Sequence, residues 1–350
     1  MKKRIALLMA LAIGSVCVFS GCNGGTKESI TVFNYGMYID PEILDDFTAE
    51  TGIEVLYEEA STPEELYAKF SAGAVKYDCL CTSEYVLMKM MSEGSLQEMD
   101  FSKFEHIDNI SPEIWEFCNT FDEGNKYVLP YFWGTVGILY NTEMVDEEID
   151  SWDVLFNGKY AGSIYMQNSM RDAFMIAEKY QGHSCNTTDR AELEAAKNLL
   201  IEQKPDVYQY LVDEVRDEMI AENAAIGVVY SGDGVLAELE NDKLKYVIPK
   251  EGTNLWIDCW AMTKDCENQD AVYEFLDYLV CREDVAEKNF EYVYYATSNQ
   301  ATIANLDEEV RNNKTLFPDL DDMSGCEVYK RLDDDTVDLM NDYWKDIKSE

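Results

Sequence analysis

The stretch NLWIDCWAM, residues 254–262, places a negative charge among aromatic side chains. In a β-strand the side chains alternate between two faces, so Trp256, Asp258 and Trp260 would share one face. A lone acid on an apolar strand requires a partner, because unpaired charges are rarely buried. Aromatic faces attract an ammonium group by about 0.5 to 2 kcal/mol each. The stretch therefore suggests a site for an organic cation.

Further aromatic residues follow other strand-like runs of the chain. Tyr35, Tyr85 and Tyr230 each come at or just after the end of such a run. Ligands of open α/β sheets bind at the carboxyl ends of the strands, so a cleft between two such sheets would gather these rings. A box of rings with two or three carboxylates suits an elongated apolar ligand with charged amine ends, because the carboxylates replace the water lost by each amine.

Enzyme chemistry has little support in the sequence. The chain carries no G-x-G-x-x-G loop, Walker A loop, G-x-S-x-G or H-E-x-x-H motif, and its histidines are His106 and His183. There is no C-x-x-C pair, which leaves a zinc site weakly supported. Its 69 acidic residues always supply some pair for a glycosidase, but no spacing singles one out. We predict a protein that is not an enzyme and holds no cofactor or metal.

The N-terminus is typical of an export signal. It begins MKKR, continues with an apolar run over residues 5–19, and reaches small residues before Cys22. The pattern FSGC resembles a bacterial lipoprotein signal, in which Cys22 is lipidated, although Phe19 stands where that signal usually has leucine or a small aliphatic residue. We expect residues 1–21 to be removed, residues 22–28 to form a flexible tether, and the protein to lie outside the cytoplasm, anchored to the cell membrane. An ordinary cleaved signal peptide is the alternative.

Charge and length limit the partners and the architecture. The formal net charge is -41, and removing residues 1–21 takes away three basic residues and no acid, giving -44. Such a surface argues against nucleic acid, which requires basic residues, and favours cationic ligands. The remaining 350 minus 21, or 329, residues exceed what one core usually serves, so two lobes are expected.

Eight cysteines remain once Cys17 and Cys22 are set aside. They are Cys79, Cys81, Cys118, Cys185, Cys259, Cys266, Cys281 and Cys326. Scattered cysteines in an exported protein could form disulfides. Aliphatic neighbours, as in YDCLCTS, favour mostly free thiols that fill the core.

Strand and helix patterns alternate along the chain. The strand candidates are residues 30–35, 53–59, 77–83, 126–141, 225–231 and 245–249 and the opening stretch. The helix candidates are residues 41–50, 63–72, 84–93, 170–180, 189–203, 268–281, 284–291 and 327–348. Such alternation predicts an α/β fold of two lobes, each a mainly parallel sheet flanked by helices. No linker separates the halves, which suggests that the chain crosses between the lobes near residues 133 and 253.

Several longer segments together resemble one family. They are FNYGMYIDPEILDDFTAETGIEV, SEYVLMKMMSEG, LPYFWGTVGILYN, SWDVLF, SMRDAF, GVVYSGD, IPKEGTNLWIDCWAM and YATSN, in that order. From about Ile30 to the C-terminus the chain resembles the spermidine/putrescine-binding proteins of bacterial ABC transporters. The resemblance implies a periplasmic-binding-protein-like fold and a monomeric receptor that delivers a polyamine to the importer's permease subunits. We place one lobe at residues 29–133 plus 254–296 and the other at 134–253 plus 297–350.

The resemblance also implies ten ligand-binding residues. They are Tyr35, Tyr38, Ser83, Tyr85, Ser169, Asp172, Tyr230, Trp256, Asp258 and Tyr295. Asp172 and Asp258 take the positions of amine-binding carboxylates, and the indole of Trp256 would pack on the methylene chain. Trp260 should lie further from the cleft, and we expect it in the core.

Some positions depart from the family pattern. Tyr35 and Tyr230 replace tryptophans, Gly36 removes a hydroxyl, and the family's late glutamine is not evident near Tyr329. Two carboxylates match the two charges of a diamine, whereas a third amine would need Glu84 or hydroxyl groups.

Two other functions stay open at this stage. The adjacent Tyr294 and Tyr295 suggest a ferric-ion receptor of the same fold, because phenolates are hard ligands for iron. An exported hydrolase is the other alternative, and it lacks any motif of its own.

Overall fold

The computed structural model describes residues 28–320, 323 and 325–349. The predicted signal peptide, the lipidation site at Cys22 and the tether up to residue 27 lie outside these residues. Within the described part of the chain, no helix has the length and apolar character needed to cross a bilayer.

The first α/β unit alternates strands with helices as predicted. Its elements are β1 (Ser29–Tyr35), α1 (Pro41–Thr51), β2 (Glu54–Ala60), α2 (Pro63–Ala72), β3 (Cys79–Ser83), α3 (Glu84–Ser92) and α4 (Pro112–Asn119). Helix α1 starts because Pro41 presets the first turn and the Asp40 side chain accepts the Glu42 N–H at 2.9 Å. It ends at Gly52, whose φ of 81° lies in the left-handed region that glycine favours.

Two long strands lead out of this unit and back to it. Strand β4 (Val128–Asn141) leaves it, and β9 (Leu255–Met262) returns. Between them lie β5 (Ile164–Gln167), α5 (Met170–Tyr180), α6 (Arg190–Gln203), β6 (Val207–Leu211), α7 (Glu214–Ile220), β7 (Ile226–Tyr230), α8 (Ser231–Glu240) and β8 (Leu244–Val247). The last elements are α9 (Gln269–Leu276), α10 (Glu283–Val293), β10 (Ala296–Thr297), α11 (Gln300–Asn305), α12 (Glu308–Arg311) and α13 (Asp334–Ser349).

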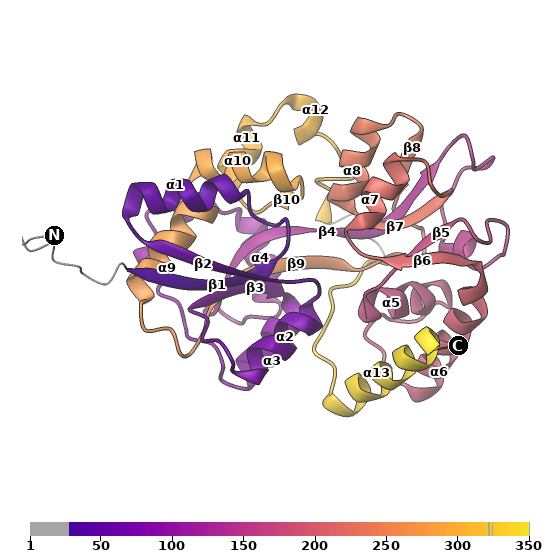
Figure 1. Cartoon of the computed structure of the whole chain (residues 1–350), viewed down its shortest axis with the longest axis horizontal. Helices are drawn as coiled ribbons and strands as arrows, with labels where there is room; N and C mark the ends of the chain where they lie inside the picture. Colours follow the sequence, from indigo (N-terminus) through magenta and orange to yellow (C-terminus); the bar gives the residue numbers. More distant parts are fainter. Residues whose placement is uncertain (1–27, 321–322, 324, 350) are drawn as a thin grey trace, which may run out of the picture.

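Among the described residues, eight strands form one path in the order β2-β1-β3-β9-β4-β7-β5-β6, and β8 and β10 each pair with β4 off this path. Parallel pairs join β1 to β2 and β3, and β5 to β6 and β7, while β4 and β9 run antiparallel to their neighbours. The first part of β4 pairs with β9, and its second part pairs with β7 and β8 (Figure 1). Strand β4 therefore continues from one half of the molecule into the other.

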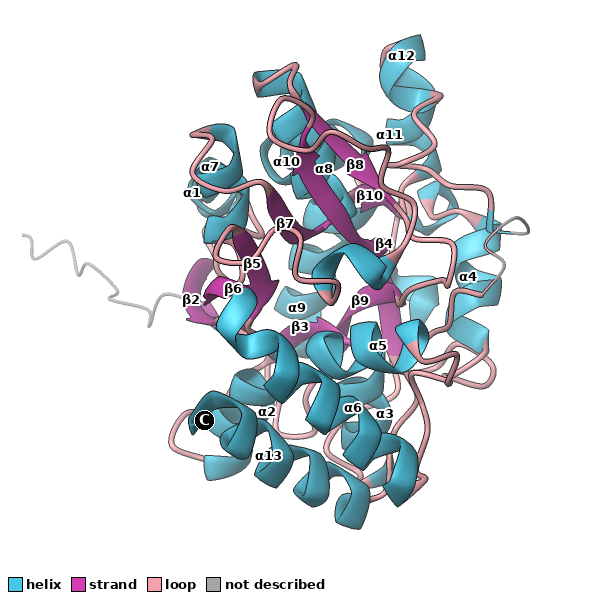
Figure 2. Cartoon of the chain, turned by 90° about the vertical axis from the view of Figure 1, so that its right-hand side faces the viewer, coloured by secondary structure: helices cyan, strands magenta, loops and turns pink. Residues whose placement is uncertain are grey.

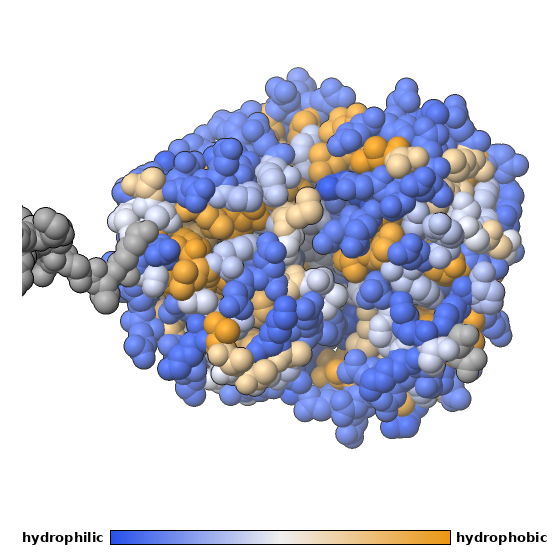
Figure 3. Space-filling view, in the orientation of Figure 1, coloured by the Kyte–Doolittle hydropathy of each residue, from blue (hydrophilic) through white to orange (hydrophobic). Residues whose placement is uncertain are grey.

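This arrangement confirms the two-lobed α/β fold. Helices flank both parts of the sheet, as a view turned by 90° also shows (Figure 2). The residue boundaries of the lobes stay a prediction. The face seen in Figure 3 is mostly hydrophilic, with smaller apolar patches, as the acidic composition leads one to expect.

The predicted terminal helix at residues 327–348 begins too early. Glu327 is extended: its N–H donates to the Thr253 carbonyl, and its carbonyl accepts the Leu255 N–H, each at 2.9 Å. Helix α13 begins only at Asp334, after the Asp333 carboxylate accepts the Thr336 N–H at 2.9 Å. Residues 326–330 thus run beside the start of β9. We call them the third crossing segment, because β4 and the return into β9 are the first two connections between the halves of the molecule.

Most of the cysteines and the indole of Trp260 lie in the hydrophobic core. All eight cysteines from Cys79 to Cys326 are free thiols, and all except Cys326 are buried. Trp260 is fully buried against Tyr131 and Phe275, with ring centroids 5.5 and 5.9 Å away. Its predicted place in the core is confirmed.

Candidate ligand-binding cleft

All ten residues that the sequence predicted for the site lie around one cleft. Tyr35 ends β1, Ser83 ends β3 and Tyr230 ends β7. Helices α3 and α8 start at the residue after β3 and β7, and α1 starts a few residues after β1. The cleft is also lined by Gly36, Met37, Ser61, Pro63, Arg171, Val212, Asp213, Arg216, Asp233, Asn254, Tyr292, Val293 and Tyr329. That these residues bind a ligand stays a prediction.

Strand β9 places the indole and the acid of the opening stretch on the cleft side. Asp258 pairs with Ser83 of β3, and Trp256 pairs with Gly134 of β4. A Cβ atom at Gly134 would lie 2.9 Å from the indole and 2.5 Å from the Ser231 hydroxyl. The missing side chain at residue 134 therefore lets the indole lie across β4, in the cleft wall.

The aromatic rings of the cleft meet edge to face. Trp256 lies 5.4 Å from Tyr295 and 5.8 Å from Tyr230, and Tyr38 lies 5.8 Å from Tyr295, between ring centroids. A Cβ atom at Gly232 would come within 1.8 Å of the Tyr295 ring, so glycine is required there for this approach. An edge-to-face contact covers a face of only one of its two rings, and aromatic faces that stay uncovered can contact a methylene chain or an ammonium group.

The carboxylate of Asp258 lies at one end of this aromatic box. It accepts hydrogen bonds from the Tyr38 and Ser83 hydroxyls, both at 2.7 Å, and only 6% of the residue is exposed. Burial raises the pKa of Asp258 from 3.8 to about 6, although the two hydroxyls partly offset this rise. A cation bound beside Asp258 would stabilise the ionised form of this carboxylate.

Asp172 supplies the carboxylate of the other half of the molecule. It lies in the first turn of α5, where the helix dipole favours a negative charge. Its oxygens accept hydrogen bonds from Tyr329 at 2.8 Å and Tyr230 at 2.9 Å. Burial raises the pKa of Asp172, and these hydroxyl groups work against the rise. The charge of Asp172 also raises the pKa of Asp258, so the two acids act on one another across the cleft.

Two further acids in the cleft, Asp233 and Asp213, were not predicted. Asp233, in the first turn of α8, accepts hydrogen bonds from the Tyr295 hydroxyl at 2.6 Å and from Arg216 at 3.3 Å. Burial raises the pKa of Asp233, and burial together with that charge raises the pKa of nearby Asp213 to about 7. The segment GVVYSGD carries Asp233, so its place after a strand end was the available signal.

Arg171 lies between two rings at the edge of the cleft. Its guanidinium carbon is 4.3 Å from the Tyr329 ring centroid and 5.3 Å from that of Tyr85. The Tyr85 hydroxyl donates to Glu64 at 2.8 Å, which brings a carboxylate from α2 to the same edge. The sequence could not indicate Tyr329, because its segment was expected to be helical.

Glu84 does not supply a carboxylate to the cleft, as the sequence suggested for a third amine. Its side chain is fully buried and accepts the backbone N–H groups of Ile257 and Tyr329, at 3.3 and 3.2 Å. Ser169 lines the cleft and caps α5, with its hydroxyl accepting the Asp172 N–H at 3.4 Å.

The cleft carries more acidic than basic side chains. Four acids line it against two arginines, a formal charge of 2 minus 4, or -2, when all are ionised. In the described part of the chain, no group of three or more His, Cys, Asp or Glu side chains could hold a metal ion. Tyr295 points at Asp233, whereas Tyr294 stacks on Phe290 at 5.2 Å, so the two phenols do not converge on one site as a ferric centre would require.

A two-lobed fold with a polar and aromatic cleft between its halves is typical of solute-binding receptors. A family model for bacterial extracellular solute-binding proteins matches residues 42–318. The chain belongs to this class.

Similar proteins narrow the class further. The spermidine/putrescine-binding periplasmic protein of Salmonella typhimurium is 32% identical over 97% of this chain and 96% of its own length. That of Escherichia coli K12 is 33% identical over 91% and 90%. A solved structure of a spermidine/putrescine ABC transporter substrate-binding protein from Streptococcus pneumoniae is 38% identical, with a TM-score of 0.76 over 92% of this chain and 99% of that one. The chain therefore belongs to the family of spermidine/putrescine-binding periplasmic proteins.

Proposed function

We propose that this protein binds a polyamine such as putrescine or spermidine in the cleft and delivers it to an ABC importer. The observation that carries the proposal is a pair of buried carboxylates, Asp258 and Asp172, in the wall of one aromatic cleft. Each carboxylate accepts two hydroxyl hydrogen bonds, which hold it in place while leaving lone pairs for an ammonium group.

In this proposal one ammonium group meets Asp258 and the other meets Asp172. The methylene chain between them lies against Trp256, whose indole forms part of the cleft wall. Binding both ends of the ligand favours diamines over monoamines, since a monoamine leaves one buried carboxylate without a partner. Asp233 provides a further acid for a third amine.

The binding cycle that we propose is closure of the two lobes around the ligand. Residues from both parts of the sheet line the cleft, so a ligand between them stabilises the closed form, as in other binding proteins that close about a hinge. We propose further that the receptor acts as a monomer without catalysis, that lipid on Cys22 holds it at the membrane, and that it docks to permease subunits.

Calorimetry on the mature protein with putrescine, spermidine, agmatine and an amino acid tests this function. We expect heat and a thermal shift with polyamines and none with the amino acid. No heat and no shift with any polyamine would exclude the proposal. A visible absorption band on adding ferric citrate would instead favour iron binding, and turnover of a sugar or peptide would favour a hydrolase.

A further inference from the structure

Glu84 is a fully buried carboxyl group that lies beside the cleft without lining it. It is the first residue of α3, directly after Ser83. The Ser83 hydroxyl does not cap the helix, because it donates to Asp258 at 2.7 Å. The residue before α3 therefore contacts the cleft carboxylate of Asp258, and the side chain of Glu84 makes other contacts.

One oxygen of Glu84 extends the hydrogen bonding between β3 and β9 beyond the end of β3. The last residue pair between β3 and β9 is Ser83 with Asp258, so the next residue of β9 in register is Ile257. The chain turns into α3 at this point and provides no further strand backbone. The Glu84 carboxylate takes the place of that backbone by accepting the Ile257 N–H at 3.3 Å. This satisfies a buried donor that would otherwise be unpaired.

The other oxygen of Glu84 reaches the third crossing segment. It accepts the Tyr329 N–H at 3.2 Å, while the Tyr329 hydroxyl donates to Asp172 at 2.8 Å. Glu84 thus connects β9, which carries Asp258, with the residue that orients the carboxylate in the other half of the cleft. A single side chain touches the supports of both proposed amine sites.

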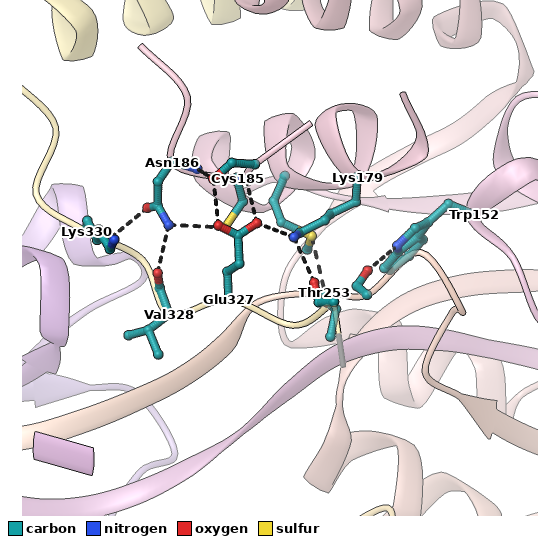
Figure 4. A network of polar contacts seen from close by, with 12 residues as sticks. Trp152, Lys179, Cys185, Asn186, Thr253, Glu327, Val328 and Lys330 are labelled. Carbon is teal, nitrogen blue, oxygen red and sulfur yellow. Dashed lines mark hydrogen bonds and ion pairs between the residues drawn. The ribbon is translucent and has the colours of Figure 1, made fainter. Parts of the chain in front are cut away.

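The far side of the third crossing segment is held by α5 and the loop after it (Figure 4). Glu327 pairs with Lys179, and Asn186 donates to the Val328 carbonyl at 2.8 Å while accepting the Lys330 N–H at 2.7 Å. With these contacts on one side, the hydrogen bond to Glu84 fixes the segment from the other. The position of Tyr329 therefore depends on both halves of the molecule.

We propose that Glu84 is a positioning residue for polyamine binding, which ties Tyr329 to β9 so that Asp172 and Asp258 are set at the spacing the ligand requires. This inference rests on the proposed function. The ionised carboxylate is the better acceptor for both N–H groups. The charge of Asp258 disfavours this ionised form, so a cation that compensates Asp258 should shift the protonation of Glu84.

The charged groups around Glu84 decide whether its pKa rises or falls when a cation binds. Asp258 faces Glu84 from β9 and Arg171 faces it from α5, with the Tyr329 ring beside them. Burial raises the pKa of Glu84 to about 8, although the Ile257 N–H and the charge of Arg171 work against the rise, so the neutral and ionised forms are both populated near neutral pH in the free receptor. A bound ammonium group beside Asp258 favours the ionised form and lowers this pKa. Binding then releases a proton from Glu84 between about pH 7 and 8, and affinity rises with pH over that range.

The test is calorimetry with putrescine at pH 7.5 in two buffers of different ionisation enthalpy, which counts released protons. We expect wild type and a Glu93→Gln control, at the exposed end of α3, to release a fraction of a proton on binding. Glu84→Gln should release fewer protons than these two proteins, with Asp213 of the cleft wall still contributing, and it should bind about tenfold more weakly, because glutamine presents an amide to one of the two N–H groups. Tyr329→Phe should also bind more weakly but keep the proton release, since it leaves Glu84 in place.

Several outcomes would overturn the inference. A folded Glu84→Gln variant with wild-type affinity and wild-type proton release excludes the role of Glu84. If this variant does not fold, Tyr329→Phe still decides, because wild-type affinity of that variant would show that Asp172 does not depend on the residue that Glu84 holds in place. Absence of polyamine binding by the wild type would instead refute the proposed function itself, so the two failures are distinguishable.

Discussion

Replacing Asp258 with asparagine should change affinity and stability in opposite directions. Asparagine keeps the size of the side chain, and its amide can still hydrogen-bond the Tyr38 and Ser83 hydroxyls that contact Asp258. What the variant loses is the negative charge. Losing one partner of a buried charge pair typically weakens binding by about 2 to 5 kcal/mol, because the other charge is left without compensation. Since each 1.4 kcal/mol is a factor of ten, we expect at least about 30-fold weaker polyamine binding.

The free receptor should become more stable in the same variant. Burial raises the pKa of Asp258 from 3.8 to about 6, so the folded state disfavours the ionised form relative to the unfolded chain. A shift of this size corresponds to about 3 kcal/mol of destabilisation at pH 7, at 1.36 kcal/mol for each pKa unit. The penalty is absent below about pH 4, grows as the pH rises to about 6, and is constant above. Asparagine should remove it and raise the melting temperature by a few degrees at pH 7 but not at pH 4.

Two measurements check this prediction, with Asp45→Asn on the exposed side of α1 as control. Calorimetry gives the affinity, and thermal unfolding of the ligand-free protein at pH 7 and pH 4 gives the stability. Unchanged affinity would place Asp258 outside the binding site. A lower melting temperature at pH 7 would show that the buried charge is already compensated in the free receptor, and would refute the electrostatic reasoning.

Three further perturbations separate the contributions of charge, hydroxyl and indole. Polyamine affinity of the wild type should fall about tenfold per pH unit below about pH 6, as Asp258 becomes protonated; a flat profile between pH 5 and 7 would contradict this. Tyr38→Phe removes a hydrogen bond to that carboxylate and should weaken binding about tenfold at pH 7 by calorimetry, whereas wild-type affinity would show that water replaces the hydroxyl. Trp256→Phe should lower polyamine affinity much more than Trp260→Phe, because Trp256 lines the cleft, while both should reduce stability to urea, since both side chains are buried; an equal loss of affinity in the two variants would refute their assignment to cleft and core.

The sequence predicted the fold because its local signals agree with the long-range structure. Alternating strand and helix patterns, with Pro41 and Gly52 marking helix ends, are decided by neighbouring residues. The terminal segment was mistaken because its structure is decided at a distance. Glu327 is extended through hydrogen bonds with Thr253 and Leu255, and its own sequence gives no sign of them.

The site was predictable where a segment that resembles the family places acids and aromatic rings together. Trp256 and Asp258 lie in such a segment, and the structure places both in the cleft wall. Tyr329 entered only with the structure, because its segment was expected to be helical, and Asp233 was overlooked although it follows the end of β7 within the segment GVVYSGD. Glu84 shows the opposite case: its place beside Ser83 suggested a ligand contact, but its side chain turns to the backbone of two neighbouring segments instead.

The most direct test of the proposed site is a crystal structure of the receptor grown with putrescine. We predict one ammonium group within hydrogen-bond distance of Asp258, the other near Asp172, and the methylene chain on the face of Trp256. A diamine bound away from both carboxylates, or held by only one of them, would contradict the account.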